Sequence, residues 1–196
     1  IELADARNLV RENPGSVVNI GGDARAPMRT TAPGAQPQRM QSFDVTVEGA
    51  DGTVARSVEL TTVAQPVFES SHLSDGVSHA AEKVRSRNTD GAPIPGNREA
   101  SIAFDFDTSR RPIRSGFATN HDNGTITFEL PDGRPRPPRR AADGTVRAEP
   151  TFYENFATWL NGQAMSRDID RIRLLRYDGS VRAILERNGN TWTVVP

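Results

Sequence analysis

Residues 42–63 contain two runs in which apolar and polar side chains alternate. Successive side chains of a β-strand point to opposite faces, so Phe43, Val45 and Val47 are expected on one face of a first strand. Asp44 then falls on the opposite, polar face. The first run therefore predicts a half-buried strand that carries a carboxylate on its polar side.

The second run follows Asp51-Gly52, a pair typical of a tight turn. Alternation after this turn places Glu59 and Thr61 on the same face of a second strand. Strands joined by a short turn pair as antiparallel neighbours. The pattern thus predicts a hairpin in which Asp44 and Glu59 face the same way from adjacent strands.

Two other segments repeat their apolar residues at helical spacing. The first covers residues 1–12 and ends at Asn13-Pro14-Gly15, which cannot continue a helix. The second covers residues 72–87. Its predicted sheet-facing stripe consists of Leu73, Val77, Ala80, Ala81 and Val84.

Short strands are expected at residues 16–20 and 98–106, before the hairpin and after the second helix. The resulting order is helix, strand, strand, strand, helix, strand. This order predicts a mixed α/β fold whose core covers residues 1–107. Agreement between local patterns and element order strengthens such an assignment.

The remainder of the chain divides into a connection and a C-terminal unit. Residues 108–150 are rich in arginine and proline and predict an extended connection. Residues 151–196 predict a helix with an aromatic face, followed by a three-stranded antiparallel meander. This unit either completes the same domain or forms a small accessory subdomain.

Two carboxylates that face the same way from adjacent strands are a ligand set for a divalent cation. Mg²⁺ is commonly held by one or two carboxylates, with water and substrate phosphate as its other ligands. Such an ion neutralises charge on a phosphate undergoing cleavage and activates the attacking water. We therefore interpret Asp44 and Glu59 as ligands for Mg²⁺ or another divalent cation.

The sequence resembles the motif of the PD-(D/E)XK nucleases in one stretch: Asp44, fourteen intervening residues, and then Glu59-Leu60-Thr61. More narrowly, residues 1–107 resemble the C-terminal nuclease domains of bacterial polymorphic and contact-dependent growth-inhibition toxins. The resemblance implies a metal-dependent hydrolase of phosphodiester bonds in tRNA or DNA, with a cognate immunity protein as partner. It also implies a toxin domain of a larger secreted protein, which acts in the cytoplasm of a target cell.

The motif departs from the family at two positions. No proline precedes Asp44, and Thr61 stands where the family has its lysine. The single lysine of the chain, Lys83, belongs to the predicted helix at 72–87, near the border of its apolar stripe. In some nucleases of this type the lysine has moved to that helix, so the resemblance implies a catalytic role for Lys83, with Thr61 in support.

Further candidates lie outside the motif. Glu2, Asp23 and His79 are additional candidate site residues: Glu2 near the first helix start, Asp23 after a Gly-Gly pair, and His79 one turn before Lys83. Four arginines are candidates for contacts to a nucleic-acid backbone. They are Arg139, Arg140, Arg171 and Arg173.

Composition narrows the function classes. The chain has 24 Lys and Arg residues and 25 Asp and Glu residues, so its net charge is close to zero. The net charge therefore does not indicate a protein that binds polyanions through its overall charge. The absence of cysteine excludes disulfides, thiolate zinc sites and a cysteine nucleophile. No apolar run is long enough to span a membrane. The chain begins without methionine, and we expect it to be part of a longer protein.

Two alternatives remain open from the sequence. The first is a metal-independent ribonuclease or other toxin that uses His72, His79 or His121 with arginines. The second is a non-enzymatic interaction module, in which Asp44 and Glu59 are exposed residues of a half-solvated sheet. The first alternative predicts activity in the presence of a chelator, and the second predicts no activity.

Overall fold

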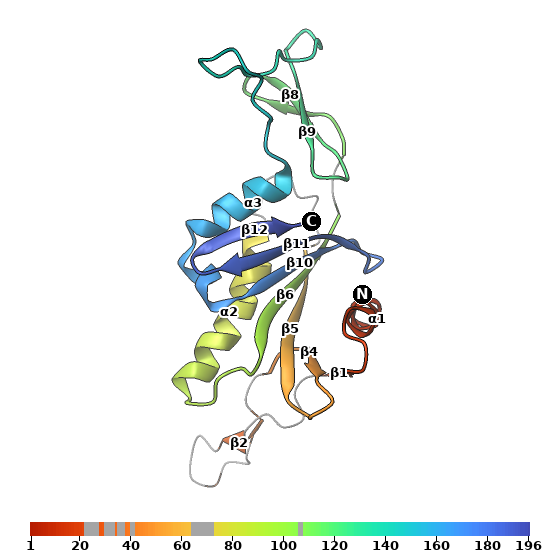
Figure 1. The fold of residues 1–196 in the computed structure, drawn as a ribbon, viewed down its shortest axis with the longest axis vertical. Coiled ribbons are helices and arrows are strands. Elements are labelled where there is room, and N and C mark those ends of the chain that lie inside the picture. The colour runs from red at the N-terminus through yellow and green to blue at the C-terminus, as the bar shows by residue number, and fades with distance from the viewer. Residues whose placement is uncertain (22–27, 30–33, 35–37, 40–41, 64–72, 106–107) are drawn as a thin grey trace.

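The computed structural model describes residues 1–21, 28–29, 34, 38–39, 42–63, 73–105 and 108–196. Within these residues, one seven-stranded mixed sheet has helices on both faces, and a small three-stranded antiparallel sheet projects from one end (Figure 1). The predicted mixed α/β class is confirmed. No helix of the described chain is both long and apolar enough to cross a membrane.

The first part of the chain follows the predicted order. Its elements are α1 (Glu2–Glu12), β1 (Val17–Ile20), the two-residue strands β2 (Met28–Arg29) and β3 (Gln38–Arg39), β4 (Val45–Glu48), β5 (Val54–Val63), α2 (Ser74–Thr89) and β6 (Asn97–Phe104). The β2–β3 pair forms a separate two-stranded sheet. The β4–β5 hairpin turns at Gly52, where a positive φ of 77° favours glycine.

The second part adds the projecting sheet and completes the main sheet. They are β7 (Arg111–Ile113), β8 (Gly116–Asn120), β9 (Ile126–Glu129), α3 (Phe152–Asn161), the 3-10 helix η2 (Ala164–Asp168), β10 (Arg171–Leu175), β11 (Val181–Asn188) and β12 (Thr191–Val195). A capping box begins α3, because Thr151 and Glu154 each bond the other's backbone N–H.

The large sheet has the strand order β1-β4-β5-β6-β10-β11-β12. Neighbouring strands pair antiparallel, except that β6 pairs parallel to both β5 and β10. The predicted meander therefore continues the main sheet through the β6–β10 pair. The core strands and the C-terminal unit form one continuous sheet.

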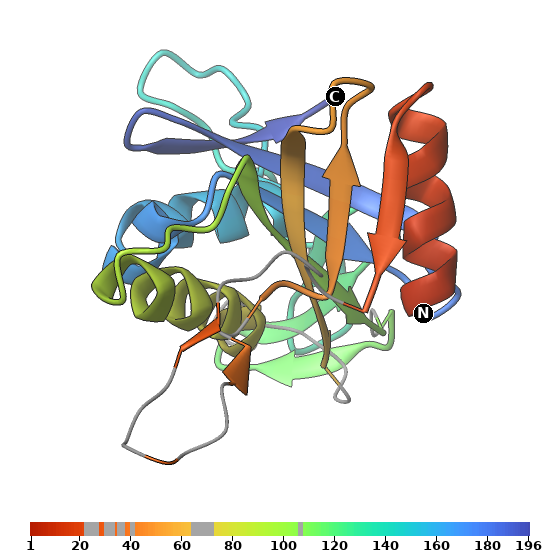
Figure 2. The ribbon, with the colours of Figure 1, turned by 90° about the horizontal axis from the view of Figure 1, so that it is seen from below.

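The helices divide between the two faces of this sheet (Figure 2). On one face, α2 and α3 cover the main apolar core, in which all five predicted stripe residues of α2 are buried. Gly76 allows close approach here, because a Cβ at that position would lie 2.8 Å from the side chain of Ile102. On the other face, α1 packs through Leu9 on Val45, Val47 and Val58.

A buried network of charged side chains joins α1 to three strands. Arg56 of β5 makes a two-pronged bond to Glu99 of β6 and also donates to Glu12 of α1 at 3.2 Å. Arg173 of β10 donates to Asp5 and, at 2.9 Å, to Glu12. Each arginine bonds directly to carboxylates, and two of these carboxylates belong to α1. The network therefore holds α1 on the sheet.

Two predictions about local structure are wrong. Phe43 does not share a face with Val45 and Val47, because β4 begins only at Val45; Phe43 packs in the main core instead. The segment 108–150 is not simply an extended connection, since it contains the sheet β7-β8-β9. Arginines stack on the rings of this sheet, Arg110 over Phe117 and Arg136 over Phe128.

Candidate functional site

Hairpin register places Asp44 beside Glu59. The β4–β5 pairing matches Val45 with Val58, and one further step along the chain sets Asp44 opposite Glu59. The Asp44 side chain is anchored there, because its Oδ2 accepts a hydrogen bond of 3.0 Å from the backbone N–H of Leu60. Like charges directly opposite each other destabilise a sheet, so this position calls for a compensating cation.

Lys83 of α2 provides that cation. Its Nζ lies 2.6 Å from Oε2 of Glu59 and 3.8 Å from Oδ1 of Asp44. It also donates to the backbone carbonyl of Ser42 at 3.2 Å. Two carboxylates and one ammonium therefore lie together on the α2 face of the sheet. They come from the residue just before β4, from the middle of β5 and from α2.

His79 completes the surroundings of Glu59. It lies one helical turn before Lys83, and its Nδ1 is 3.6 Å from Oε1 of Glu59. The two carboxylate oxygens of Glu59 thus face two different side chains of the same helix. The imidazole is 59% exposed, whereas the Glu59 side chain is only 2% exposed. His79 therefore lies between the buried carboxylate and solvent.

Burial changes the acid–base behaviour of Glu59. Loss of water contact raises the pKa of this carboxyl, since the charged form is poorly solvated there. The neighbouring Lys83 opposes this rise, and the negative charge of Asp44 adds to it. The bond to Lys83 is therefore the main interaction that favours the charged form of Glu59.

A pocket of about 350 Å³ opens beside these residues. Thr61, two positions after Glu59 on the same face of β5, forms one wall, and its buried Oγ1 has no hydrogen-bond partner among the described residues. The opposite wall is α2, through Asp75, Ser78, His79 and Glu82. The site is therefore reached from solvent between β5 and α2.

The residues present fit a divalent cation of the kind the sequence predicts. Asp44 and Glu59 already converge on one positive centre, the ammonium of Lys83. In the part of the chain that the structure describes, no group of three or more His, Asp or Glu side chains gathers into a metal site. A bound ion would have these two carboxylates as protein ligands, which leaves positions for water and phosphate, as is usual for Mg²⁺.

The other predicted site residues fall into three groups. Thr61 and His79 lie at the site, and the structure brings both to the pocket. Glu2 is not part of the site: it is an exposed residue of α1, and α1 packs on the face of β5 opposite Glu59. Asp23 lies outside the described residues, as does His72.

The four predicted nucleic-acid contacts have different environments. The prediction that Arg173 contacts nucleic acid is wrong, because this side chain is fully buried in the network beneath α1. Arg171 pairs with Glu186 at 3.3 Å across the β10–β11 pair. Arg139 and Arg140 are exposed residues of the segment between β9 and α3, and neither lines the pocket beside Glu59.

The sequence interpretation missed three pocket residues. Asp75, Ser78 and Glu82 were not singled out, although they lie at positions four, one and three residues from His79 along α2. Residues three or four apart share one face of a helix, so the proximity of Asp75 and Glu82 to His79 was encoded in the spacing, whereas that of Ser78 was not. No local signal showed that this face borders a pocket.

Comparisons of this chain with protein families, curated proteins and solved structures found no match.

Proposed function

We propose that the chain is a metal-dependent phosphodiesterase that hydrolyses nucleic acid, with its site at Asp44, Glu59 and Lys83. The observation that supports it best is the convergence of two cross-strand carboxylates on one ammonium, beside a pocket that Thr61 and His79 line. A bound cation and a lysine can both stabilise the charge that develops on a phosphodiester during hydrolysis.

Asp44 and Glu59 would hold the divalent cation, which supplies charge neutralisation at the phosphate and an activated water. Asp44 is oriented for this role by the backbone of Leu60. Glu59 is oriented by Lys83 and His79, which face its two oxygens. The carboxylates are therefore fixed before substrate arrives, which is the arrangement that electrostatic catalysis needs.

Lys83 and His79 would act on the substrate itself. The ammonium of Lys83 lies at the carboxylate pair and binds a phosphate oxygen as negative charge increases during attack. His79 lies at the opening of the pocket, where a protonated imidazole can donate to the departing sugar oxygen. Water would add to phosphorus and release one proton to solvent, the P–O bond to the sugar would break, and the sugar oxygen would take the proton of His79, which solvent then reprotonates.

Element order and the Asp44–Glu59 spacing support a biological setting as well. We propose a toxin domain of a larger secreted bacterial protein, acting on RNA or DNA in the cytoplasm of a target cell and inhibited by a cognate immunity protein. This setting rests on the resemblance of residues 1–107 to such nuclease domains. The chemistry of the site does not depend on it.

A cleavage assay tests the proposed activity. Purified chain is incubated with supercoiled plasmid and with tRNA, with Mg²⁺ or Mn²⁺ and with EDTA. We expect cleavage of one substrate that requires the metal and falls at least about 100-fold in Glu59→Gln, a change that keeps the size of the side chain. Glu82→Gln is the matched control, because Glu82 lines the same pocket but is not one of the two carboxylates that meet at the Lys83 ammonium.

The same assay separates the alternatives. Cleavage that persists in EDTA and in Glu59→Gln but disappears in His79→Gln or His121→Gln would replace the metal site with a histidine-based ribonuclease. Absence of cleavage of every substrate with every metal would favour an interaction module. Equal losses in Glu59→Gln and Glu82→Gln would contradict the assignment of the site.

A further inference from the structure

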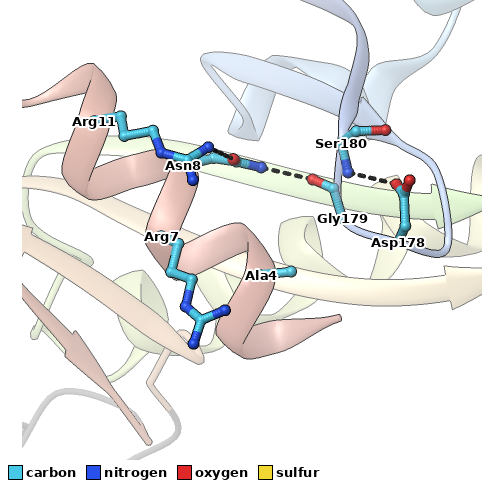
Figure 3. A pocket seen from close by; sticks show the side chains of 7 residues that line it. All are labelled: Ala4, Arg7, Asn8, Arg11, Asp178, Gly179 and Ser180. Carbon is cyan, nitrogen blue, oxygen red and sulfur yellow. Dashed lines mark hydrogen bonds between the residues drawn. The ribbon is translucent and has the colours of Figure 1, made fainter.

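A second pocket lies between α1 and the turn that joins β10 to β11 (Figure 3). Its volume is about 250 Å³, and no residue lines both this pocket and the one beside Glu59. A volume of this size is below the range usual for drug-sized ligands, so the enclosed part of a ligand must be small. The residues that line the pocket are Ala4, Arg7, Asn8 and Arg11 of α1 and Asp178, Gly179 and Ser180 of the turn.

The helix and the turn are held together by a close contact at one side of the pocket. Asn8 Nδ2 donates a hydrogen bond of 2.6 Å to the carbonyl oxygen of Gly179 (Figure 3). Gly179 has a φ of 83°, which favours glycine, and a Cβ there would lie 2.4 Å from the Cβ of Ala4. The glycine therefore serves both the turn and its close approach to α1, and this approach forms the pocket.

Two arginines give the helix side of the pocket a positive charge. Arg7 and Arg11 are one helical turn apart, so their side chains leave the same side of α1. Neither forms an ion pair with a described residue, and Arg11 makes one long hydrogen bond, 3.4 Å to Asn8. Asp5 and Glu12 of the same helix point into the buried network instead. Like charges one turn apart repel each other, and a bound anion would relieve this repulsion.

The turn side of the pocket carries a carboxylate and a hydroxyl. Asp178 Oδ1 accepts a hydrogen bond of 2.8 Å from the backbone N–H of Ser180, and hydrogen bonding by Ser180 lowers the pKa of Asp178. The carboxylate is therefore charged at neutral pH, and it keeps acceptor positions beyond this bond. The Ser180 hydroxyl accepts a hydrogen bond of 3.3 Å from Arg176 and can donate its own hydrogen.

The two sides of the pocket together select the chemistry of a ligand. Guanidinium groups such as those of Arg7 and Arg11 bind phosphate through paired, charge-assisted hydrogen bonds. Free phosphate would be repelled by the carboxylate of Asp178, whereas a phosphate attached to a sugar can place a hydroxyl group there. The small volume limits the enclosed part to the phosphate and one sugar ring.

We propose that this pocket binds a phosphorylated sugar of the kind that a nucleotide contains. The phosphate pairs with the guanidinium groups of Arg7 and Arg11 and accepts the hydroxyl hydrogen of Ser180. A sugar hydroxyl donates to the carboxylate of Asp178. Because the two pockets share no lining residue, this site goes beyond the proposed hydrolysis and does not rest on it.

Isothermal titration calorimetry of the full chain with ribose 5-phosphate, in EDTA, tests the site. We expect one saturable site that weakens at least about tenfold in Arg7→Gln combined with Arg11→Gln, because the phosphate loses its charged donors. Both positions are exposed, so the fold should be retained, which circular dichroism checks. Arg114→Gln combined with Arg147→Gln is the matched control, because it removes two exposed arginines that do not line the pocket.

Asp178→Asn tests the contact to the sugar separately. Asparagine keeps an oxygen for the Ser180 N–H, but its second group is a donor that cannot accept from a hydroxyl. The change also removes the charge that repels free phosphate. The preference for ribose 5-phosphate over inorganic phosphate should therefore fall about tenfold in this variant.

Four results would overturn the proposal. They are equal binding of inorganic phosphate and ribose 5-phosphate by the wild type, an unchanged preference in Asp178→Asn, unchanged affinity in the Arg7 and Arg11 variant, and an equal loss in the control variant. Glu59→Gln should bind ribose 5-phosphate as the wild type does. Failure of the proposed hydrolysis and failure of this site are therefore separate outcomes.

A further probe identifies the source of the sugar phosphate. A short RNA with a 5′-phosphate that binds more tightly than ribose 5-phosphate would support a site for the end of a nucleic-acid strand. Ribose 5-phosphate that binds as tightly as this RNA would support a site for a free sugar phosphate. Displacement of ribose 5-phosphate by glycine at equal concentration would overturn the proposal in favour of an amino acid, whose carboxylate and ammonium match the same charges.

Discussion

The two faces of strand β5 carry two charge clusters of different kinds. On the α1 face, Arg56 belongs to a network in which arginines meet carboxylates in close, multiply bonded pairs. On the α2 face, Glu59 shares one lysine with Asp44 and faces a pocket. Positions 56 and 59 are three residues apart, yet one cluster is enclosed and the other is open.

The two clusters differ in whether their charged side chains can bind other partners. The planar guanidinium of Arg56 matches both oxygens of Glu99 and cannot lose its proton, so it is suited to a permanent structural bond. Lys83 is a compact charge on a flexible side chain that leaves room near its partners. The comparison indicates that the arginine network stabilises α1, whereas the lysine cluster is available to a cation and a phosphate.

The largest expected effect comes from breaking the enclosed cluster. Arg173→Met leaves Asp5 unpaired in a buried position, and we expect a loss of about 3–5 kcal/mol in the free energy of unfolding, measured with urea. Arg171→Met, two residues away on the same face of β10 but partly exposed, is the matched control, with an expected loss of about 1 kcal/mol or less. Equal losses in the two variants would contradict the structural role of the network.

The next largest effect is expected from removing the ammonium group of Lys83. Lys83→Met should lower turnover about 100-fold, or about 2.7 kcal/mol of activation free energy, because the phosphate loses its ammonium partner. Divalent metal should bind this variant at least as tightly as the wild type, since no ammonium competes for the carboxylates. Arg85→Met, on the exposed side of α2, should change neither quantity. Weaker metal binding in Lys83→Met would show that the lysine has another role.

The smallest effect is a pH dependence of stability that originates from Glu59. Because its folded pKa is raised above the ordinary 4.5, Glu59 favours the folded state below pH 4.5, and this contribution is lost as pH rises through the folded pKa. Glu59→Gln lacks the titration, so in EDTA its stability relative to the wild type should increase as the pH rises from 4 to 7. A constant difference across this range would mean that burial does not perturb Glu59.

The local features of the site could be predicted from the sequence because they depend on short periodic patterns. Alternation fixed the faces of Asp44 and Glu59, and the turn at Asp51-Gly52 fixed their register. Helical spacing placed Lys83 at the border of the α2 stripe, within reach of the sheet. These relations involve neighbours in one hairpin or one helix.

The rest depended on contacts between distant segments. The burial of Arg173 follows from acids that α1 brings to it, and nothing around residue 173 shows this. The parallel pairing of β6 with β10, which unites the sheet, joins segments about 70 residues apart. In the projecting sheet, arginines stacked on Phe117 and Phe128 form an ordered structure from a sequence whose composition predicts an open connection.

Mn²⁺ binding measured by electron paramagnetic resonance tests the central claim most directly, since it asks whether Asp44 and Glu59 share one cation. The account predicts one site in the wild-type chain, weakened at least about tenfold in Asp44→Asn and in Glu59→Gln and unchanged in Glu82→Gln. Undiminished Mn²⁺ binding in both Asp44→Asn and Glu59→Gln would contradict it.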